Sequence, residues 1–224
     1  MNIFCALMAP ALILLGSPAM SQPETAGFAI AGLPGSLHWV NAPVRSKTDA
    51  GTLRISAAGK TDLFVDPQEA YTVVNSPKAL FQPDEEFLLS ARVATPFRSD
   101  YDAGVLVLWA GPSDWAKLCF EFSPQKKPFV VSVVNNGISD DCNHVPISNG
   151  WIYLRIAGLG HHCYAFHYSM DGKAWNLVRY FTLSSTKAVA AGFSSQSPTG
   201  SGCESAFSAI TYQKKKLADI RNGQ

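Results

Sequence analysis

A lysine and a glutamate four residues apart are the clearest candidates for ligand chemistry in this chain. Lys117 and Glu121 fall on one face of the strand-like run at residues 115–122, whereas Leu118 and Phe120 fall on the other. A strand has this pattern when one face packs and the other meets water or a ligand. Four residues span about 13 Å along a strand, so we expect the two side chains to share a face and to interact through neighbouring strands.

Further polar and aromatic residues are candidates for the same ligand site. Asp102 and Asp140 fall in loops or at strand ends, where carboxylates could line the rim of a groove. Tyr101, Trp109 and Trp115 could present flat aromatic faces to a sugar. The structural alternative is that the charged residues only solvate a sheet face, through cross-strand ion pairs worth about 0.2–1 kcal/mol each.

Hydrolysis of a glycosidic bond is an alternative function for Glu121. A glycosidase needs two carboxylates about 5–10 Å apart. Residues 122–125 after Glu121 are Phe-Ser-Pro-Gln, so the sequence offers no second acid nearby, and Asp102 or Asp140 would have to supply one from another strand.

Metal binding has less support in the sequence, and we expect no cofactor. Asp140, Asp141 and Asn143 supply oxygen ligands that suit Ca²⁺, although an Asx-rich turn explains the same residues. His161 and His162 follow a Gly-rich turn and would point to opposite faces, which favours a surface hairpin over a metal site.

Short runs rich in Val, Leu, Ile and aromatic residues recur along most of the chain. Turn signals such as Gly-Pro, Asn-Gly and Asp-Gly separate nearly all of them, and no helical stripe exceeds two turns. This pattern predicts an all-β sandwich of two antiparallel sheets with few or no helices. The predicted strands are residues 52–57, 87–93, 104–109, 116–122, 129–135, 152–157, 163–169, 177–183, 188–194 and 206–212.

The N-terminal residues predict export. Residues 3–15 are almost wholly apolar, and Ala19 and Ser21 fit a small-residue cleavage site, so residues 1–21 are predicted to be a signal peptide. The apolar run is shorter than the ~20 residues that span a bilayer. We therefore expect a secreted or periplasmic protein with an irregular segment at 22–36, one sandwich at 37–212 and a basic, flexible tail at 213–224.

Export makes disulfides an expectation for the four cysteines that follow the signal peptide. Cys142 and Cys203 both fall in segments rich in small polar residues and are the favoured pair. Cys119 falls within a strand and is either a free thiol or a partner of Cys163. Four cysteines allow three pairings, and their spacing does not choose among them.

The balance of charge argues against a nucleic-acid or membrane-surface partner. The chain has 18 basic and 17 acidic residues, and four of the basic ones lie in the C-terminal tail. Partners of that kind require a basic face on the domain itself. No segment after residue 21 is long and apolar enough to span a membrane, and the sequence does not determine an oligomeric state.

The order of several short motifs resembles one known family. The motifs begin at Trp39 and end at Pro198, and together they cover nearly the whole chain after the signal peptide. In this order they resemble the concanavalin A-like domains of unknown function 1349, the regulation-of-enolase-protein-like family. Cys119 and Asp141 depart from the pattern, which has a small residue and a tryptophan there. The motifs are residues 39–43, 53–57, 61–64, 101–107, 115–121, 136–140, 169–175, 191–193 and 197–198.

The resemblance implies a jelly-roll sandwich with one concave sheet and no settled activity. Similar modules are appended to some secreted glycosidases, which implies a sugar-binding or structural role. With the residues above, this favours a secreted, non-catalytic module that binds carbohydrate through the polar sheet face around Lys117 and Glu121. The alternatives are a carbohydrate-active hydrolase that uses Glu121, and a structural or protein-interaction domain without a small ligand.

Overall fold

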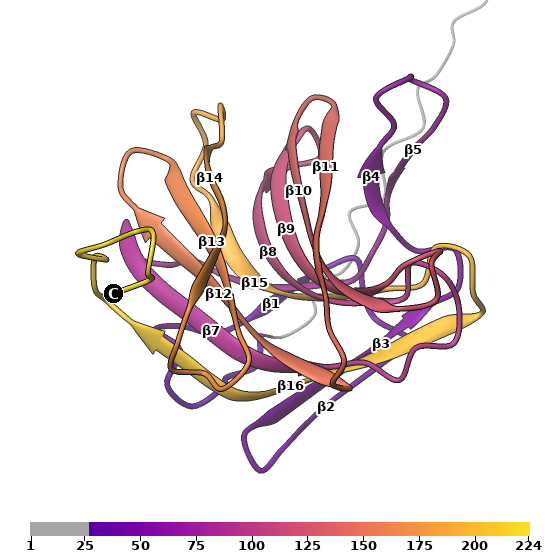
Figure 1. Cartoon of the computed structure of the whole chain (residues 1–224), viewed down its shortest axis with the longest axis horizontal. Coiled ribbons are helices and arrows are strands. Elements are labelled where there is room, and N and C mark those ends of the chain that lie inside the picture. The colour runs from indigo at the N-terminus through magenta and orange to yellow at the C-terminus, as the bar shows by residue number, and fades with distance from the viewer. Residues whose placement is uncertain (1–26) are drawn as a thin grey trace, which may run out of the picture.

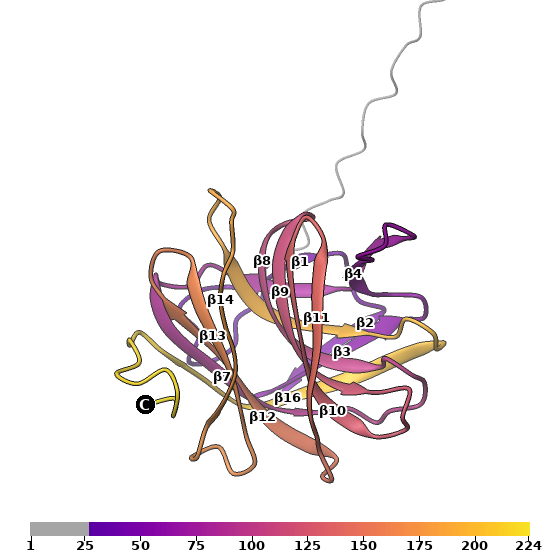
Figure 2. The same ribbon diagram turned by 45° about the horizontal axis from the view of Figure 1, so that its top comes forward.

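Two antiparallel seven-stranded sheets face each other as a sandwich (Figure 1 and Figure 2). The computed structural model describes residues 27–224, and this part of the chain contains sixteen strands and no helix. Accordingly, the described residues include no helix that could cross a membrane. The predicted all-β jelly-roll class is confirmed, whereas the predicted signal peptide and its cleavage site lie outside the described residues.

The strands divide into a first sheet, a second sheet and a separate hairpin. The first sheet contains, in spatial order, β1 (His38–Val40), β6 (Lys78–Phe81), β15 (Ala190–Gln196), β8 (Ala103–Gly111), β9 (Asp114–Phe122), β10 (Pro128–Asn136) and β11 (Ser139–Pro146). The second contains β14 (Asn176–Thr182), β13 (Cys163–Ser169), β12 (Trp151–Leu159), β7 (Glu86–Ala94), β16 (Gly202–Gln213), β3 (Thr52–Ala58) and β2 (Arg45–Asp49). The hairpin consists of β4 (Leu63–Val65) and β5 (Thr72–Val74).

The alternation of side chains along β9 separates the core from the face that carries the site. Leu118 and Phe120 point into the large apolar cluster between the two sheets. Cys119 belongs to a second apolar cluster, which lies on the opposite, outer face of the first sheet and includes Leu63 of the hairpin. Each fully buried leucine or phenylalanine contributes about 1.5–3 kcal/mol. The hairpin is therefore packed onto the outer face of the first sheet.

The structure contains every predicted strand and six more. The sequence prediction missed β1, β2, β4, β5, β6 and β11. Asp140, Asp141 and Asn143, for which an Asx-rich turn was expected, instead lie on the edge strand β11, which pairs with β10. An edge strand is packed on fewer sides, so polar residues replace the apolar alternation that reveals interior strands.

The expected disulfides are absent, because all four cysteines at positions 119–203 are free thiols. Cys142 is exposed on edge strand β11, whereas Cys203 is buried on β16, an interior strand of the other sheet. Cys119 packs on the outer face of the first sheet and Cys163 on that of the second. The sandwich core therefore separates Cys119 from Cys163.

The C-terminal residues fold back onto the second sheet, contrary to the expected flexible tail. Lys214 forms an ion pair with Asp84 at 2.6 Å, and Lys216 forms one with Glu86 at 2.9 Å. Leu217 is buried in an apolar cluster on the outer face of this sheet. The basic residues are thus matched to acidic residues at the start of β7 and just before it, which the linear sequence did not indicate.

Candidate functional site

A pocket of about 470 Å³ lies on the outer face of the first sheet, beside the β4–β5 hairpin. Strands β9, β10 and β11 provide its floor, the hairpin provides one wall, and the loops before β8 and after β15 complete the rim. The lining residues are Lys60, Asp62, Phe64, Tyr71, Val73, Tyr101, Lys117, Glu121, Val133, Asp141, Gln196, Pro198 and Thr199.

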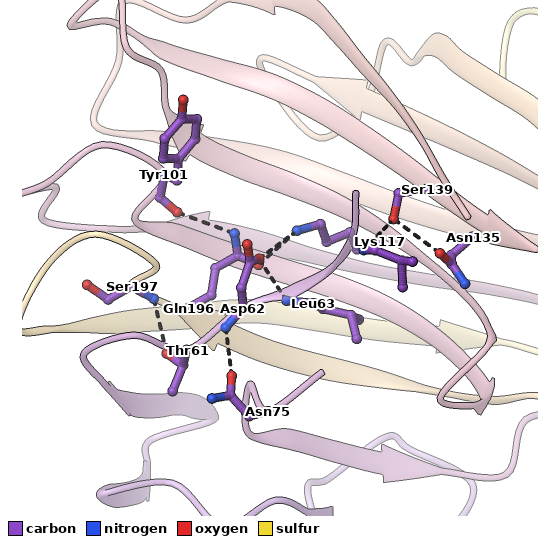
Figure 3. A network of polar contacts seen from close by, with 11 residues as sticks. Thr61, Asp62, Leu63, Asn75, Tyr101, Lys117, Asn135, Ser139, Gln196 and Ser197 are labelled. Atoms are coloured by element: carbon purple, nitrogen blue, oxygen red, sulfur yellow. Dashed lines mark hydrogen bonds and ion pairs between the residues drawn. The ribbon is translucent and has the colours of Figure 1, made fainter. Parts of the chain in front are cut away.

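Lys117 is held at the floor of this pocket by partners from two different parts of the fold. Its ammonium donates to Asp62 Oδ1 at 3.1 Å and to Gln196 Oε1 at 3.1 Å (Figure 3). Gln196 in turn donates to the backbone oxygen of Tyr101 at 3.3 Å. Only 3% of Lys117 is exposed. A buried ammonium with such partners has a fixed position and direction.

The surroundings of Lys117 favour its charged form. Burial alone would lower the pKa of Lys117, but Asp62, Cys119 and Glu121 attract the ammonium and raise its pKa above the ordinary value. An opposite charge within a few ångströms stabilises the charged form more strongly where water is excluded. Lys117 therefore remains a charged ammonium group at the pocket floor.

Glu121 lines the same pocket without a fixed partner. Only 7% of the residue is exposed, and among residues 27–224 its carboxyl group forms no hydrogen bond or ion pair. Burial raises the pKa of Glu121 to about 8, although Lys117 acts in the opposite direction. At neutral pH most molecules therefore have a protonated Glu121, which can donate a hydrogen bond as well as accept one.

Asp141 adds a third carboxyl group to the pocket lining. It stands opposite Val133 in the β10–β11 register, and Val133 stands opposite Lys117. Although the Asp141 side chain is exposed, loss of solvation around its carboxyl group raises its pKa; Lys117 acts in the opposite direction, and Asp62 and Asp140 add smaller increases. The lining therefore has more acidic groups than cations available to neutralise them.

A network of hydrogen bonds positions the hairpin and hence Asp62. The side chain of Asn75 accepts from the backbone N–H of Asp62 at 2.9 Å (Figure 3). The hydroxyl of Ser139 accepts from the backbone N–H of Val65 at 2.9 Å and donates to Asn135 at 3.1 Å. The hairpin is thus tied to β10 and β11, the strands that form part of the pocket floor.

Aromatic rings form the more exposed walls. Phe64 and Tyr71 stack with ring centroids 5.9 Å apart, and 51% of Tyr71 is exposed. Tyr101, on the opposite rim, is 40% exposed. Aromatic faces above a polar floor suit a ligand with one apolar face and several hydroxyl groups, because rings supply apolar contact while polar groups set orientation.

The structure brings three of the seven predicted site residues together in the pocket: Lys117, Glu121 and Tyr101. The others lie elsewhere. Asp102 is fully buried and accepts hydrogen bonds from Ser197 and from backbone N–H groups at 98 and 99. Trp115 is fully buried and donates to the backbone oxygen of Pro112.

Trp109 and Asp140 are also occupied outside the pocket. The ring of Trp109 lies 4.7 Å from the ammonium of Lys78, and Asp140 forms an ion pair with Arg179 of β14. Asp140 and Asp141 are neighbours on a strand and therefore point to opposite faces. This separates the carboxylates of the suggested Ca²⁺ site, and residues 27–224 contain no group of three His, Cys, Asp or Glu side chains arranged for a metal ion.

Sequence reasoning missed several of the pocket residues. Asp62, Phe64 and Tyr71 come from the short hairpin, which lacks a clear alternating pattern, and Gln196 lies at the end of β15. Asp62 and Phe64 did fall within one of the motifs that carry the family resemblance. No spacing in the sequence linked Asp62 and Phe64 to Lys117, because each lies more than fifty positions before it.

Comparison with solved structures supports the fold. A functionally unknown protein from Saccharomyces cerevisiae is 23% identical, with a TM-score of 0.73, over 80% of this chain and 96% of that one. A mutant of the GH43 protein BlXynB from Bacillus licheniformis is 16% identical, with a TM-score of 0.63, over 80% of this chain and 37% of that one.

The same fold occurs within other GH43 proteins. The xyloglucan-locus protein GH43B from Bacteroides ovatus is 14% identical, with a TM-score of 0.63, over 90% of this chain and 41% of that one. This chain thus corresponds to about two fifths of each of these two GH43 proteins. None of the curated proteins compared with it matches its sequence.

The family model described as "Protein of unknown function (DUF1349)" matches residues 39–215, a span that includes both sheets from β1 to β16 and every residue of the pocket lining. The resemblance carried by the motifs from Trp39 to Pro198 is therefore confirmed, and the chain belongs to the DUF1349 family.

Proposed function

We propose that this protein is an exported, non-catalytic module that binds carbohydrate in the pocket between the β4–β5 hairpin and the first sheet. The observation that carries the proposal is Glu121, which is almost completely buried in the pocket lining and has no hydrogen-bond partner among residues 27–224, beside the firmly held Lys117. A carboxyl group with so little access to water is poorly solvated, so a ligand that supplies a hydrogen bond to it gains affinity.

The walls of the pocket agree with a sugar as ligand. Tyr71 and Tyr101 can contact the apolar face of a sugar ring, while Lys117, Gln196 and Glu121 can bind its hydroxyl groups. A volume of about 470 Å³ lies within the usual range for small-molecule sites. GH43 proteins, one of them from a xyloglucan locus, contain the same fold, which is consistent with a carbohydrate ligand.

A glycan array probed with the purified protein tests this proposal. We expect selective binding by the wild type, and at least a tenfold loss in a Tyr71→Ala/Tyr101→Ala double variant. Tyr180→Ala is the matched control, because Tyr180 is 55% exposed on β14 and does not line the pocket. Binding that survives the double variant, or no binding by folded protein, would move the function to a protein-interaction or structural role.

Glycoside hydrolysis is the second candidate. The pKa of Glu121, raised by burial to about 8, suits a general acid, and Asp62 and Asp141 line the same pocket. If the protein is a hydrolase, Glu121→Gln abolishes product release from the glycan bound on the array. The non-catalytic module predicts that wild-type protein releases no product and that Glu121→Gln only changes affinity.

A further inference from the structure

The charges of the pocket lining are unbalanced toward the acidic side. Three carboxyl groups, from Asp62, Glu121 and Asp141, face two lysines. One of these lysines, Lys117, is already paired with Asp62. The other, Lys60, is exposed at the rim and donates to the backbone oxygen of Thr199. Among residues 27–224, neither Glu121 nor Asp141 forms an ion pair; Glu121 is almost completely buried, whereas Asp141 is exposed on edge strand β11.

The pocket already accommodates one ammonium group, that of Lys117. Lys117 is almost completely buried, and the surrounding carboxyl groups still keep its pKa above the ordinary value despite the cost of burial. Loss of solvation raises the pKa values of Glu121 and Asp141, and the charge of Lys117, which acts in the opposite direction on both, does not fully offset it. A second, ligand-borne ammonium would relieve both.

The position of Glu121 favours an organic cation over a metal ion. Within residues 27–224 no three His, Cys, Asp or Glu side chains converge as a metal site requires. One ammonium needs only one close carboxylate, further hydrogen-bond acceptors and an aromatic face. Glu121, Gln196 and the rings of Tyr71 and Tyr101 line the same pocket and match these needs.

We propose that the pocket selects glycans that carry a free primary amine, with the ammonium of an amino sugar bound to the carboxylate of Glu121 and favoured by the nearby charge of Asp141. This rests on the proposed carbohydrate-binding function and specifies its ligand class. A glycan with a neutral acetamido or hydroxyl group at the same position has no positive charge to pair with the carboxylate of Glu121.

Calorimetry with three matched probes tests the proposal: β-1,4-linked trimers of glucosamine, N-acetylglucosamine and glucose. We expect the glucosamine trimer to bind about tenfold or more tightly than the other two, as a charge-assisted hydrogen bond implies. Glu121→Gln removes this preference. Glu69→Gln, which removes a charge from the exposed turn between β4 and β5, retains it.

Proton release gives a second readout that a general loss of binding would not reproduce. At pH 5 both the ligand amine and Glu121 hold protons, so ionising Glu121 on binding releases close to one proton per ligand. Titrations in buffers of different ionisation enthalpy measure this release, and Glu121→Gln abolishes it. The other titratable groups facing Glu121 are Lys117 and Cys119 on β9, Asp141 on β11, Asp62 and Tyr71 of the hairpin region, and Tyr101 and Lys60 at the rim.

Two results would overturn the amine preference. One is equal or weaker binding of the glucosamine trimer relative to the other two, and the other is failure to bind it at all. The glycan array tests the carbohydrate-binding proposal independently of this preference. A neutral glycan that binds the wild type but not the Tyr71→Ala/Tyr101→Ala variant would still support that function.

Discussion

At the scale of single residues, two buried titratable side chains on strand β9 differ in whether they have hydrogen-bond partners. Lys117 is satisfied by Asp62 and Gln196, whereas Glu121 has no partner among the described residues. Burying a polar group without a partner costs free energy that folding must offset elsewhere. Glu121 therefore weakens the free protein, and that cost is consistent with a role in binding rather than in stability.

Replacing Glu121 by Gln should stabilise the protein at neutral and alkaline pH. Burial raises the pKa of Glu121 in the folded state to about 8 from its ordinary value of 4.5. The folded protein thus binds more protons than the unfolded chain between these values, and wild-type stability falls as the pH rises through this window. We expect the free energy of unfolding of Glu121→Gln not to fall across this window, and to exceed that of the wild type by about 2–4 kcal/mol at pH 8.

Urea denaturation at pH 5 and pH 8 measures this effect. Glu69→Gln should behave as the wild type, because Glu69 is exposed. An identical pH dependence in the wild type and in Glu121→Gln would contradict the assigned environment of Glu121.

Replacing Asp62 by Asn should destabilise the protein. Lys117 would keep Gln196 as a partner but lose the carboxylate that neutralises its buried charge. Breaking a buried ion pair on one side costs about 3–5 kcal/mol, and we expect the lower part of this range because Asp62 is partly exposed. The free energy of unfolding measures the loss.

Asp49→Asn is the matched control for this substitution. Asp49 pairs with Lys47 on the surface, with both side chains about two thirds exposed. Exposed pairs of this kind contribute less than about 1 kcal/mol. Equal losses of unfolding free energy in Asp62→Asn and Asp49→Asn would contradict a larger contribution from the buried Lys117–Asp62 pair.

At the scale of elements, the β4–β5 hairpin depends on a few hydrogen bonds to the first sheet. Ser139→Ala removes the acceptor for the backbone N–H of Val65 and the link to Asn135. We expect a loss of about 1 kcal/mol and faster amide hydrogen exchange confined to the hairpin. The exposed Ser148 provides the control, Ser148→Ala. Unchanged exchange at residues 63–74 in Ser139→Ala would show that other contacts hold the hairpin.

The C-terminal segment should contribute to stability, since it packs on the second sheet. Leu217 is buried with Leu88, Ala157 and Ala165 on the outer face of that sheet. Leu217→Ala should therefore lower the free energy of unfolding by about 2–3 kcal/mol, whereas Lys215→Ala, at an exposed position, should change little. A thermal melt of both variants decides, and an unaffected Leu217→Ala would mean that the segment is not firmly docked.

The same scale shows what the sequence could and could not predict. Interior strands such as β7, β9 and β12 were visible, because packing on both sides demands apolar residues at fixed spacing. The exposed edge strands β2 and β11 and the three-residue strands of the hairpin were missed, because few of their residues pack against the core. Because the hairpin forms one wall of the pocket, the sequence did not predict that wall either.

At the scale of the whole molecule, the polar pocket lies beside the apolar cluster on the outer face of the first sheet. Lys117 and Glu121 could be assigned to one face of a strand from their spacing, and the structure places both in the pocket lining, where they are buried rather than exposed. Asp102 and Trp115 could not be excluded in advance, because a loop carboxylate and a strand tryptophan look the same in sequence whether they bind a ligand or hold the fold together.

The measurement that tests the central claim most directly is a calorimetric titration of the best glycan from the array. The wild type, Tyr71→Ala/Tyr101→Ala and Tyr180→Ala would be compared under the same conditions. We predict that Kd rises at least tenfold in the double variant, because two aromatic contacts are lost, and that it stays unchanged in Tyr180→Ala. Equal affinity in all three proteins would contradict the claim that this pocket binds carbohydrate.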